Sequence, residues 1–276
     1  MEKKEKGVLS FLYTTVPGRA VLKALTARPV SKIAGAFCDC PLSKPLIKGF
    51  VKKNGIDLSE YVTSEFSCFN DCFTRKIKPE LRPVCMEGDA LISPCDGLLS
   101  AYKSEKGMVF PAKQSSYSVA SMLQDDALAG EFEGGTVLVI RLCVQHYHRY
   151  CYLDSGTKGE NFFIKGCLHT VRPIALENRP VFCENCREYT VMDTENFGRV
   201  IQCEIGAMLV GRILNHHGAG QMKRGEEKGM FLYGGSTVVL LLQKDAAILP
   251  ESYFEATQRG METPVKYGEK IGAKRC

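Results

Sequence analysis

The sequence predicts an α+β protein, in which a basic helical region precedes a mostly antiparallel β body. Residues 1–53 carry eleven Lys and Arg against three Asp and Glu, a net charge of +8, whereas residues 54–276 carry −3. From about residue 91, short β-branched runs bounded by Gly replace helix-like periodicity. With 276 residues and 45% apolar residues, the chain can bury a sizeable core and is not disordered. We expect a membrane-proximal helical region over residues 1–65 and a β-rich catalytic domain over residues 66–276.

The basic region has the pattern of amphipathic helices. Apolar residues recur at helical spacing from Arg19 to Arg28. A second helix is expected after a Ser43 cap, with an apolar stripe within residues 47–51 and a stop at Asn54-Gly55. Such helices either pack their apolar face on the body or lie on anionic lipid, where each Lys or Arg contributes about 1 kcal/mol.

The body is expected to consist of short strands. Four β-branched runs are the strand candidates, at residues 136–140, 200–203, 208–210 and 237–242. Residues 117–128 are the best candidate for a helix in this part of the chain. Residues 230–233, a Gly234-Gly235 turn and the strand from residue 237 have the pattern of a β-hairpin.

Neither a membrane span nor a metal site is expected from the sequence. The longest purely apolar run is Val238 to Leu242, whereas a transmembrane helix needs about 20 residues. Without a clear export signal, the thirteen Cys residues are expected to be reduced thiols. Cys183-x-x-Cys186 is half of a zinc site, and no second half of suitable spacing accompanies it.

The segment that carries chemistry is Gly234-Gly235-Ser236-Thr237. A glycine lets a neighbouring nucleophile approach its carbonyl, so the Ser236 hydroxyl can attack the carbonyl of Gly235 and form an ester. Elimination would then cut the chain and leave a dehydroalanine, which hydrolyses to a pyruvoyl group. Asp96 in a tight turn, and His146 and His148 after a predicted strand, supply the residue types that activate a hydroxyl. If the two histidines lie on one strand, their side chains share a face.

These residues belong to a set of blocks that resembles the phosphatidylserine decarboxylases, in particular the shorter bacterial members. Seven blocks occur in the family's order: F-T-R (73–75) with R-P (82–83), S-P-C-D-G (93–97), Y-H-R-Y (147–150) with D-S-G (154–156), H-T-V-R-P-I-A-L (169–176), E-N-C-R-E (184–188), I-G-A-M-L-V-G (205–211), and G-E-E-x-G-x-F (225–231) leading into G-G-S-T (234–237). One block alone would be weak evidence, but seven in order are highly specific.

The resemblance implies a self-processing lyase. Cleavage between Gly235 and Ser236 would produce a β chain of residues 1–235 and an α chain of residues 236–276, which stay together as a heterodimer. Ser236 would become a pyruvoyl cofactor that forms a Schiff base with phosphatidylserine and releases carbon dioxide to give phosphatidylethanolamine. Asp96 matches the family's charge-relay Asp.

The sequence departs from the family in its histidine motif. The family usually reads Y-H-R-x-H, with the second His serving self-cleavage and the first tied to decarboxylation. Here His148 keeps the first position, but Cys151 occupies the second, and a neutral thiol is a poor base. We expect His148 to serve both steps, with His169 and His146 as alternative relay residues. A weaker departure is Arg172, where the family more often has Asn.

Two other functions share parts of this pattern. A pyruvoyl decarboxylase of a soluble amino acid would cleave itself but has no use for a basic amphipathic region. A lipid-binding β domain would keep an intact chain. A nucleic-acid partner is not expected, because no recognition motif accompanies the basic residues. The implied substrate is an anionic phospholipid, so we expect peripheral attachment to the cytoplasmic side of the cell membrane.

Overall fold

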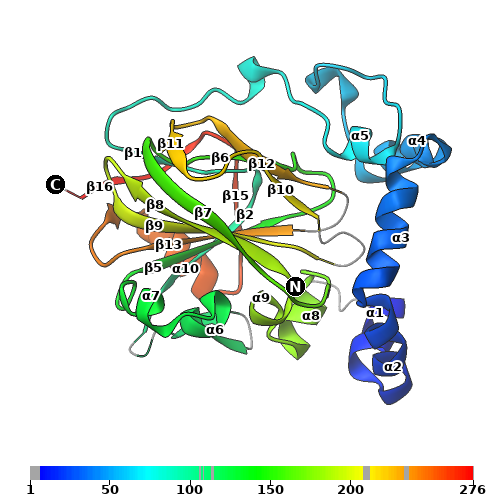
Figure 1. Ribbon diagram of the computed structural model, residues 1–276, viewed down its shortest axis with the longest axis horizontal. Helices are drawn as coiled ribbons and strands as arrows, with labels where there is room; N and C mark the ends of the chain where they lie inside the picture. The colour runs from blue at the N-terminus through cyan, green and yellow to red at the C-terminus, as the bar shows by residue number, and fades with distance from the viewer. Residues whose placement is uncertain are drawn as a thin grey trace.

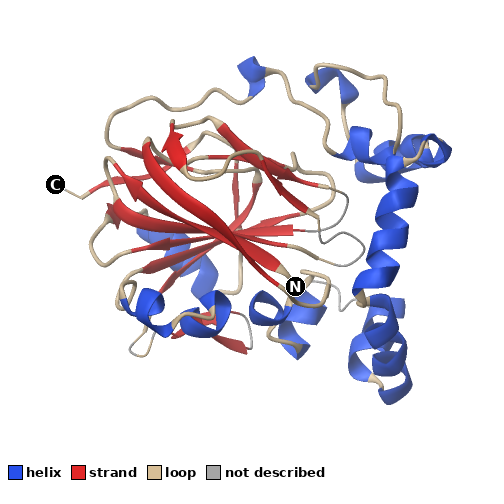
Figure 2. Cartoon of the chain, viewed as in Figure 1, coloured by secondary structure: helices blue, strands red, loops and turns tan. Residues whose placement is uncertain are grey.

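The chain folds into helices at its N-terminus followed by a strand-rich body, which confirms the predicted α+β class (Figures 1 and 2). The structure is a computed structural model, and it describes residues 7–105, 107, 109–112, 115–207, 212–232 and 236–275. No helix within those residues has the length and apolar character needed to cross a membrane. All cysteines within the same ranges are free thiols.

Four helices precede the body and lie along one side of it (Figure 1). They are α1 (Val8–Thr14), α2 (Val16–Leu25), α3 (Arg28–Asp39) and α4 (Pro45–Asn54). The helix expected from Arg19 to Arg28 is wrong in its bounds, because Pro29 fits only the first turn of a helix and α3 therefore begins anew at Arg28. The stop at Gly55 is confirmed, since Gly55 adopts the left-handed conformation with φ 61°.

Ser43 does not cap α4 as expected. It lies inside the 3-10 helix η1 (Pro41–Ser43), where its hydroxyl donates to the carbonyl of Cys40 at 2.7 Å and accepts from the Phe69 amide at 2.9 Å. This serine therefore joins the N-terminal helices to the short helix α5 (Phe69–Phe73) that leads into the body. Two further 3-10 helices, η2 (Leu58–Glu60) and η3 (Pro79–Leu81), lie on either side of α5 in the sequence.

The body is organised around an eight-stranded antiparallel sheet with the order β11-β7-β8-β9-β13-β5-β2-β15. Its strands are β2 (Gly97–Lys103), β5 (Thr136–Leu142), β7 (Gly156–Ile164), β8 (Arg187–Thr194), β9 (Gly198–Ile205), β11 (Gly220–Met222), β13 (Ser236–Leu242) and β15 (Thr263–Val265). The strand predictions at 136–140, 200–203 and 237–242 are confirmed as parts of β5, β9 and β13, whereas residues 208–210 lie outside the described residues.

Smaller sheets cover one face of the large sheet. They are formed by β1 (Ala90–Ile92), β14 (Ala247–Ile248) and β16 (Lys270–Lys274), and by β6 (Arg149–Cys151), β10 (Ile213–Asn215) and β12 (Glu227–Phe231). The helices α6 (Val119–Leu123), α7 (Asp126–Gly130), α8 (Pro173–Asn178) and α9 (Val181–Glu184), with the β3–β4 ribbon (Val109–Ala112 and Ser115–Ser118), cover the other face (Figure 1). The last helix is α10 (Glu251–Gln258).

Because side chains alternate along a strand, the large sheet separates two cores. Val238 and Leu240 point to the side of the small sheets, whereas Val239 and Leu241 point to the side of α6–α9. Every residue of β13 is buried. This explains why its sequence is a continuous apolar run instead of an alternating one.

The predicted hairpin across the two glycines is wrong. The residues before the glycines form β12, which pairs with β6 and β10 in a small sheet, whereas β13 pairs with β5 and β9 in the large sheet. Both edges of β13 are thus occupied, and no edge remains for β12. The chain therefore passes from one sheet to the other between Leu232 and Ser236, and Gly234 and Gly235 lie outside the described residues.

The helix predicted over residues 117–128 is also wrong. Its first two residues end strand β4, and α6 and α7 are separate short helices. Gln124 stops α6 with a left-handed conformation of φ 55°, and Asp125 caps α7 by accepting a hydrogen bond from the Leu128 amide at 2.9 Å. The apolar spacing in this segment fits a bent pair of helices as well as one straight helix.

A buried ion pair lies between the large sheet and the β6–β12–β10 sheet. The Lys228 ammonium donates to both carboxylate oxygens of Glu204 at 2.8 Å, and both side chains are fully buried. Asn215 accepts from the same ammonium at 3.0 Å, and its amide donates to Glu204 at 3.3 Å. Two opposite charges and an amide therefore replace water in a site with no access to solvent.

We expect Lys228→Met to lower the free energy of unfolding by about 3–5 kcal/mol, because it leaves a buried carboxylate without its counter-charge. The double variant Lys228→Met/Glu204→Gln is expected to regain most of that loss. Urea denaturation of the two variants measures both effects. Equal stability of the single variant and the wild type would contradict this account of the pair.

Candidate functional site

Ser236, Asp96 and the histidine loop lie at one end of the large sheet. Ser236 is the first residue of β13 and pairs with Leu142, the last residue of β5. The loop that carries His146 and His148 begins directly after Leu142, and Asp96 directly precedes β2, the next strand beyond β5. Neighbouring strands lie about 4.8 Å apart, so three distant parts of the sequence meet here.

Ser236 is buried at this end of the sheet, with 2% of its surface exposed. Its side chain shares a face with Val238 and Leu240, and this face looks toward the small sheets. Within the described part of the chain, the Ser236 hydroxyl has no hydrogen-bond partner. A buried hydroxyl without a hydrogen-bond partner lowers the stability of the fold, so its presence at a strand end indicates a chemical role. Gly235, the other half of the expected cleavage site, lies outside the described residues.

Asp96 is held by three donors. The guanidinium of Arg82 forms a forked pair with both carboxylate oxygens, with Nε–Oδ1 and Nη2–Oδ2 distances of 2.7 Å. The backbone amide of Tyr267 donates to Oδ1 at 2.9 Å. These bonds fix the carboxylate at the start of β2, largely shielded from water. Sequence reasoning gave Arg82 no role, although it forms part of the R-P block.

His148 is fully buried and lies just before β6. Its Nδ1 is 2.8 Å from the carbonyl oxygen of His146. The centroid of its ring lies 4.1 Å from the centroid of the Phe73 ring. A carbonyl only accepts hydrogen bonds, so Nδ1 carries a proton, and in the neutral form of the ring the lone pair lies on Nε2. The backbone carbonyl of His148 also accepts from the amide of Phe231, the last residue of β12.

His146 lies in the same loop with a different hydrogen-bond pattern. Its Nδ1 accepts from the amide of Cys143 at 3.0 Å. Burial lowers the pKa of His146, and the charge of Asp96 opposes that shift. The two histidines lie in the loop before β6 and not on a strand, so the condition under which their side chains would share a face is not met. Arg75 of the F-T-R block positions this turn by donating to the carbonyl of Gln145 at 2.9 Å.

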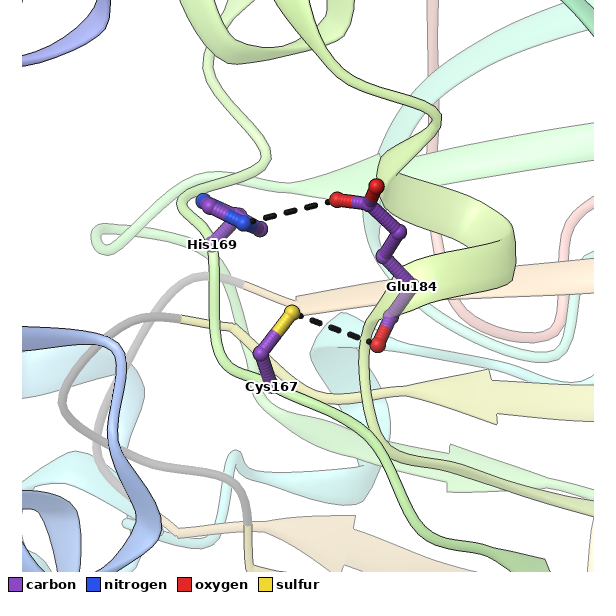
Figure 3. A group of neighbouring side chains, drawn as sticks. All are labelled: Cys167, His169 and Glu184. Carbon is purple, nitrogen blue, oxygen red and sulfur yellow. Dashed lines mark hydrogen bonds and ion pairs between the residues drawn. The ribbon is translucent and has the colours of Figure 1, made fainter. Parts of the chain in front are cut away.

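His169 is bound to other elements. Its Nδ1 is 3.2 Å from the hydroxyl of Tyr13 in α1. Its Nε2 is 3.5 Å from the carboxylate of Glu184 in α9 (Figure 3). Burial lowers the pKa of His169 to about 4, so the ring is neutral at pH 7. These contacts tie His169 to the N-terminal helices and to α9.

Cys151 lies in β6 and is fully buried. Burial raises the pKa of this thiol to about 12, so it is protonated at neutral pH. Its backbone amide donates to the carbonyl of Pro94, two residues before Asp96. Cys151 therefore packs beside the site as a protonated thiol and cannot serve as a base.

We expect Cys151 to resist alkylation by iodoacetamide at pH 8 in the folded protein, because only about one in 10,000 thiols with a pKa of about 12 is ionised there. Peptide mass spectrometry after timed labelling measures this. Cys85, which is partly exposed, serves as the control and is expected to react. Labelling of Cys151 at the rate of Cys85 would contradict the assignment.

Comparison with known proteins identifies the family of this chain. The model of the phosphatidylserine decarboxylase family matches residues 69–273, which include Asp96, His148 and Ser236. The chain is 44% identical over 273 residues to phosphatidylserine decarboxylase proenzyme 2 of Clostridium acetobutylicum, covering 98% of this chain and 94% of the relative. It is 41% identical to the phosphatidylserine decarboxylase proenzymes of Clostridium perfringens (96% of this chain, 92% of the relative) and Ruminiclostridium cellulolyticum (96% and 90%). The chain therefore belongs to the phosphatidylserine decarboxylase family.

Proposed function

We propose that this protein is a self-processing phosphatidylserine decarboxylase whose Ser236 becomes a pyruvoyl group. The observation that carries the proposal is the buried hydroxyl of Ser236, which has no hydrogen-bond partner within the described residues. It lies at the end of the large sheet where the loop with His148 begins and where Asp96 precedes β2. The family membership supports a decarboxylase, and the relatives are named as proenzymes.

Self-cleavage begins with the Ser236 hydroxyl. His148 Nε2 accepts the hydroxyl proton while the oxygen attacks the carbonyl carbon of Gly235, and it then gives this proton to the departing nitrogen. The peptide bond is thereby exchanged for an ester with a free amine on Ser236. Removal of the Ser236 Cα proton then expels the carboxylate of Gly235 and leaves a dehydroalanine. One water hydrolyses its imine tautomer, releasing ammonia and leaving the pyruvoyl group at the start of residues 236–276.

The surroundings of Ser236 fit a pyruvoyl group. Conversion replaces the hydroxymethyl group of Ser236 by a methyl group, so it suits a position where the hydroxyl makes no hydrogen bond within the described residues. When present, its carbonyl supplies an electron sink for decarboxylation of an amine-linked substrate. β13 holds this position from both sides through its pairing with β5 and β9.

Asp96 and His148 have separate tasks in this proposal. His148 holds and moves protons at Nε2, since its Nδ1 is committed to the carbonyl of His146. Asp96 supplies the negative charge that stabilises a protonated imidazole at this end of the sheet. Its field reaches the histidine loop, because it acts to raise the pKa of His146. Arg82 keeps the carboxylate in place.

The N-terminal helices suit an anionic membrane surface. Large apolar side chains on them are exposed to solvent, namely Val8, Phe11, Val16, Val21, Val30, Ile33, Phe37, Leu42 and Leu46. The same segment exposes the bases Arg19, Lys23, Lys32, Lys44, Lys48, Lys52 and Lys53. Exposed apolar residues beside a net positive charge favour peripheral attachment to anionic lipid and therefore a lipid substrate over a soluble amino acid. We place this attachment on the cytoplasmic side of the cell membrane.

Intact mass spectrometry tests self-cleavage. We expect the wild type to give two chains, of residues 1–235 and 236–276, the smaller one starting with a blocked pyruvoyl group. Ser236→Ala and His148→Ala are expected to remain single uncut chains, because they remove the nucleophile and the base. Ser104→Ala is the matched control, since Ser104 is also buried and its hydroxyl also has no partner within the described residues. An uncut wild type would refute the proposal, and normal cleavage of His148→Ala would refute the role of His148.

Arg82→Lys is expected to slow self-cleavage about tenfold. Lysine keeps the positive charge but cannot form the forked pair, and one lost charge-assisted hydrogen bond costs about 1.5 kcal/mol or more. A time course on a denaturing gel measures the rate. Arg224→Lys, which changes another buried Arg–Asp pair, is the control for a general loss of stability. Equal rates for Arg82→Lys and the wild type would mean that the fork does not position Asp96.

Liposome co-sedimentation tests membrane attachment. Lys48→Gln/Lys52→Gln is expected to weaken binding to vesicles containing phosphatidylserine about 30-fold, since each Lys near the surface contributes about 1 kcal/mol. Lys244→Gln/Lys274→Gln, on exposed body positions, is the charge-matched control. Wild-type binding that is equal for neutral and anionic vesicles, or insensitive to salt, would contradict an electrostatic contribution.

A further inference from the structure

A thiol, an imidazole and a carboxylate converge outside the proposed catalytic site. The donor atoms of Cys167, His169 and Glu184 all lie within 4.8 Å of one another. Figure 3 shows the imidazole edge of His169 facing the Glu184 carboxylate, whereas the Cys167 sulfur points toward the backbone carbonyl of Glu184, to which the thiol donates at 3.3 Å. These groups come from two segments, residues 167–169 and the last residue of α9.

The two segments form a rigid frame. The Cys167 amide donates to the carbonyl of Glu184 at 3.0 Å. The Asn185 side chain accepts from the amide of His169 at 2.9 Å and donates to its carbonyl at 2.8 Å. A Cβ on Gly166 would lie 2.3 Å from the carbonyl oxygen of Glu184, so only glycine allows this close approach. The donors are therefore held together by the backbone.

The distances between the donors suit a shared cation better than a direct hydrogen bond. His169 Nε2 and Glu184 Oε2 are 3.5 Å apart, which exceeds an ordinary N–H···O bond. Two ligands at about 2.0–2.1 Å from one tetrahedral zinc ion are about 3.3 Å apart. Behind the ring, the Tyr13 hydroxyl lies 3.2 Å from Nδ1, in the position of the outer-shell partner that orients a metal-bound histidine.

We propose that Cys167 Sγ, His169 Nε2 and Glu184 Oε2 form a site for one divalent transition metal of the zinc type, with water as the fourth ligand. Binding releases the Cys167 thiol proton to solvent, because the thiolate is the metal ligand. A thiolate and an imidazole favour such a metal over Mg²⁺ or Ca²⁺. The partly exposed side of Cys167 and Glu184 leaves room for water and for entry of the ion.

The site lies where backbone hydrogen bonds already join α9 to residues 167–169. A bound metal would clamp α9 to residues 167–169, and Tyr13 extends this connection to α1. Arg179 lies 3.9 Å from the other carboxylate oxygen of Glu184, so its charge opposes the metal. The affinity of this site for the metal thus depends on the charge of Arg179, which a substitution can remove without changing a metal ligand.

Titration of the full-length protein with Co²⁺ and Zn²⁺ tests the proposal without an activity assay. The protein is first reduced with a non-chelating phosphine and freed of metal by EDTA. We expect one Co²⁺ per chain, with thiolate-to-cobalt charge-transfer absorption that Zn²⁺ abolishes. Cys167→Ser is expected to lose that absorption and to weaken Zn²⁺ binding at least about 100-fold. Cys40→Ser, at another partly exposed thiol, is the control and is expected to keep both.

If Cys167→Ser is poorly folded, two further variants test whether this cluster binds the metal. Glu184→Gln is expected to weaken Zn²⁺ binding at least about tenfold, whereas Arg179→Gln is expected to strengthen it. Absence of stoichiometric Co²⁺ binding by the wild type would overturn the proposal. Retention of the charge-transfer absorption in Cys167→Ser would assign the metal to other thiols. Unchanged Zn²⁺ binding in Glu184→Gln would exclude Glu184 as a ligand. Either result would also overturn the proposal.

Discussion

β13 is paired on both edges, with β5 through seven residue pairs and with β9 through six, and all its side chains are buried. This double pairing fixes Ser236 at the end of the sheet independently of the residues that precede it. If the chain is cut before Ser236, the new terminus stays where it was, because backbone hydrogen bonds on two sides hold the strand. A reactive group placed here needs no further anchor, and the proposed two-chain product remains one folded unit.

The remaining groups of the site are held in the same way, by bonds that leave little freedom. Arg82 and the Tyr267 amide hold the Asp96 carboxylate, and the carbonyl of His146 orients the His148 ring. Farther along the same face, Glu204 and Lys228 neutralise each other at full burial. These polar groups are therefore paired within the protein. The hydroxyls of Ser236 and Thr237 and the side-chain oxygen of Gln202, by contrast, have no hydrogen-bond partner among the described residues.

The N-terminal helices pack some of their apolar side chains against the body and expose others to solvent. Leu12, Tyr13 and Leu22 are buried in the core that also contains α6–α9. Other apolar side chains of the same helices remain exposed beside lysines. Tyr13 contacts both His169 and the Thr170 amide, so the segment proposed to meet the membrane is joined to the strand-rich body. The proposed metal cluster lies at this junction.

Local patterns in the sequence were sufficient for several features. The apolar run after Ser236 predicted a buried strand, Asn54-Gly55 predicted a helix end, and the charge of residues 1–53 distinguished the first helices from the body. The family blocks led to Asp96, His148 and Ser236. An apolar run, a helix stop and a net charge can each be read from residues that follow one another in the chain, so the sequence is enough to recognise them.

Only the tertiary structure decided which segments meet. Strand pairing separated β12 from β13, although their sequences have the pattern of one hairpin, because β5 and β9 occupy both edges of β13. The pairing of Arg82 with Asp96 and of Lys228 with Glu204 joins residues distant in sequence, as does the meeting of Cys167 with Glu184. Such contacts depend on the packing of whole layers and on the free-energy cost of burying charge, which no short sequence pattern records. For this protein, the sequence determined the residue types of the site, and the fold determined their partners.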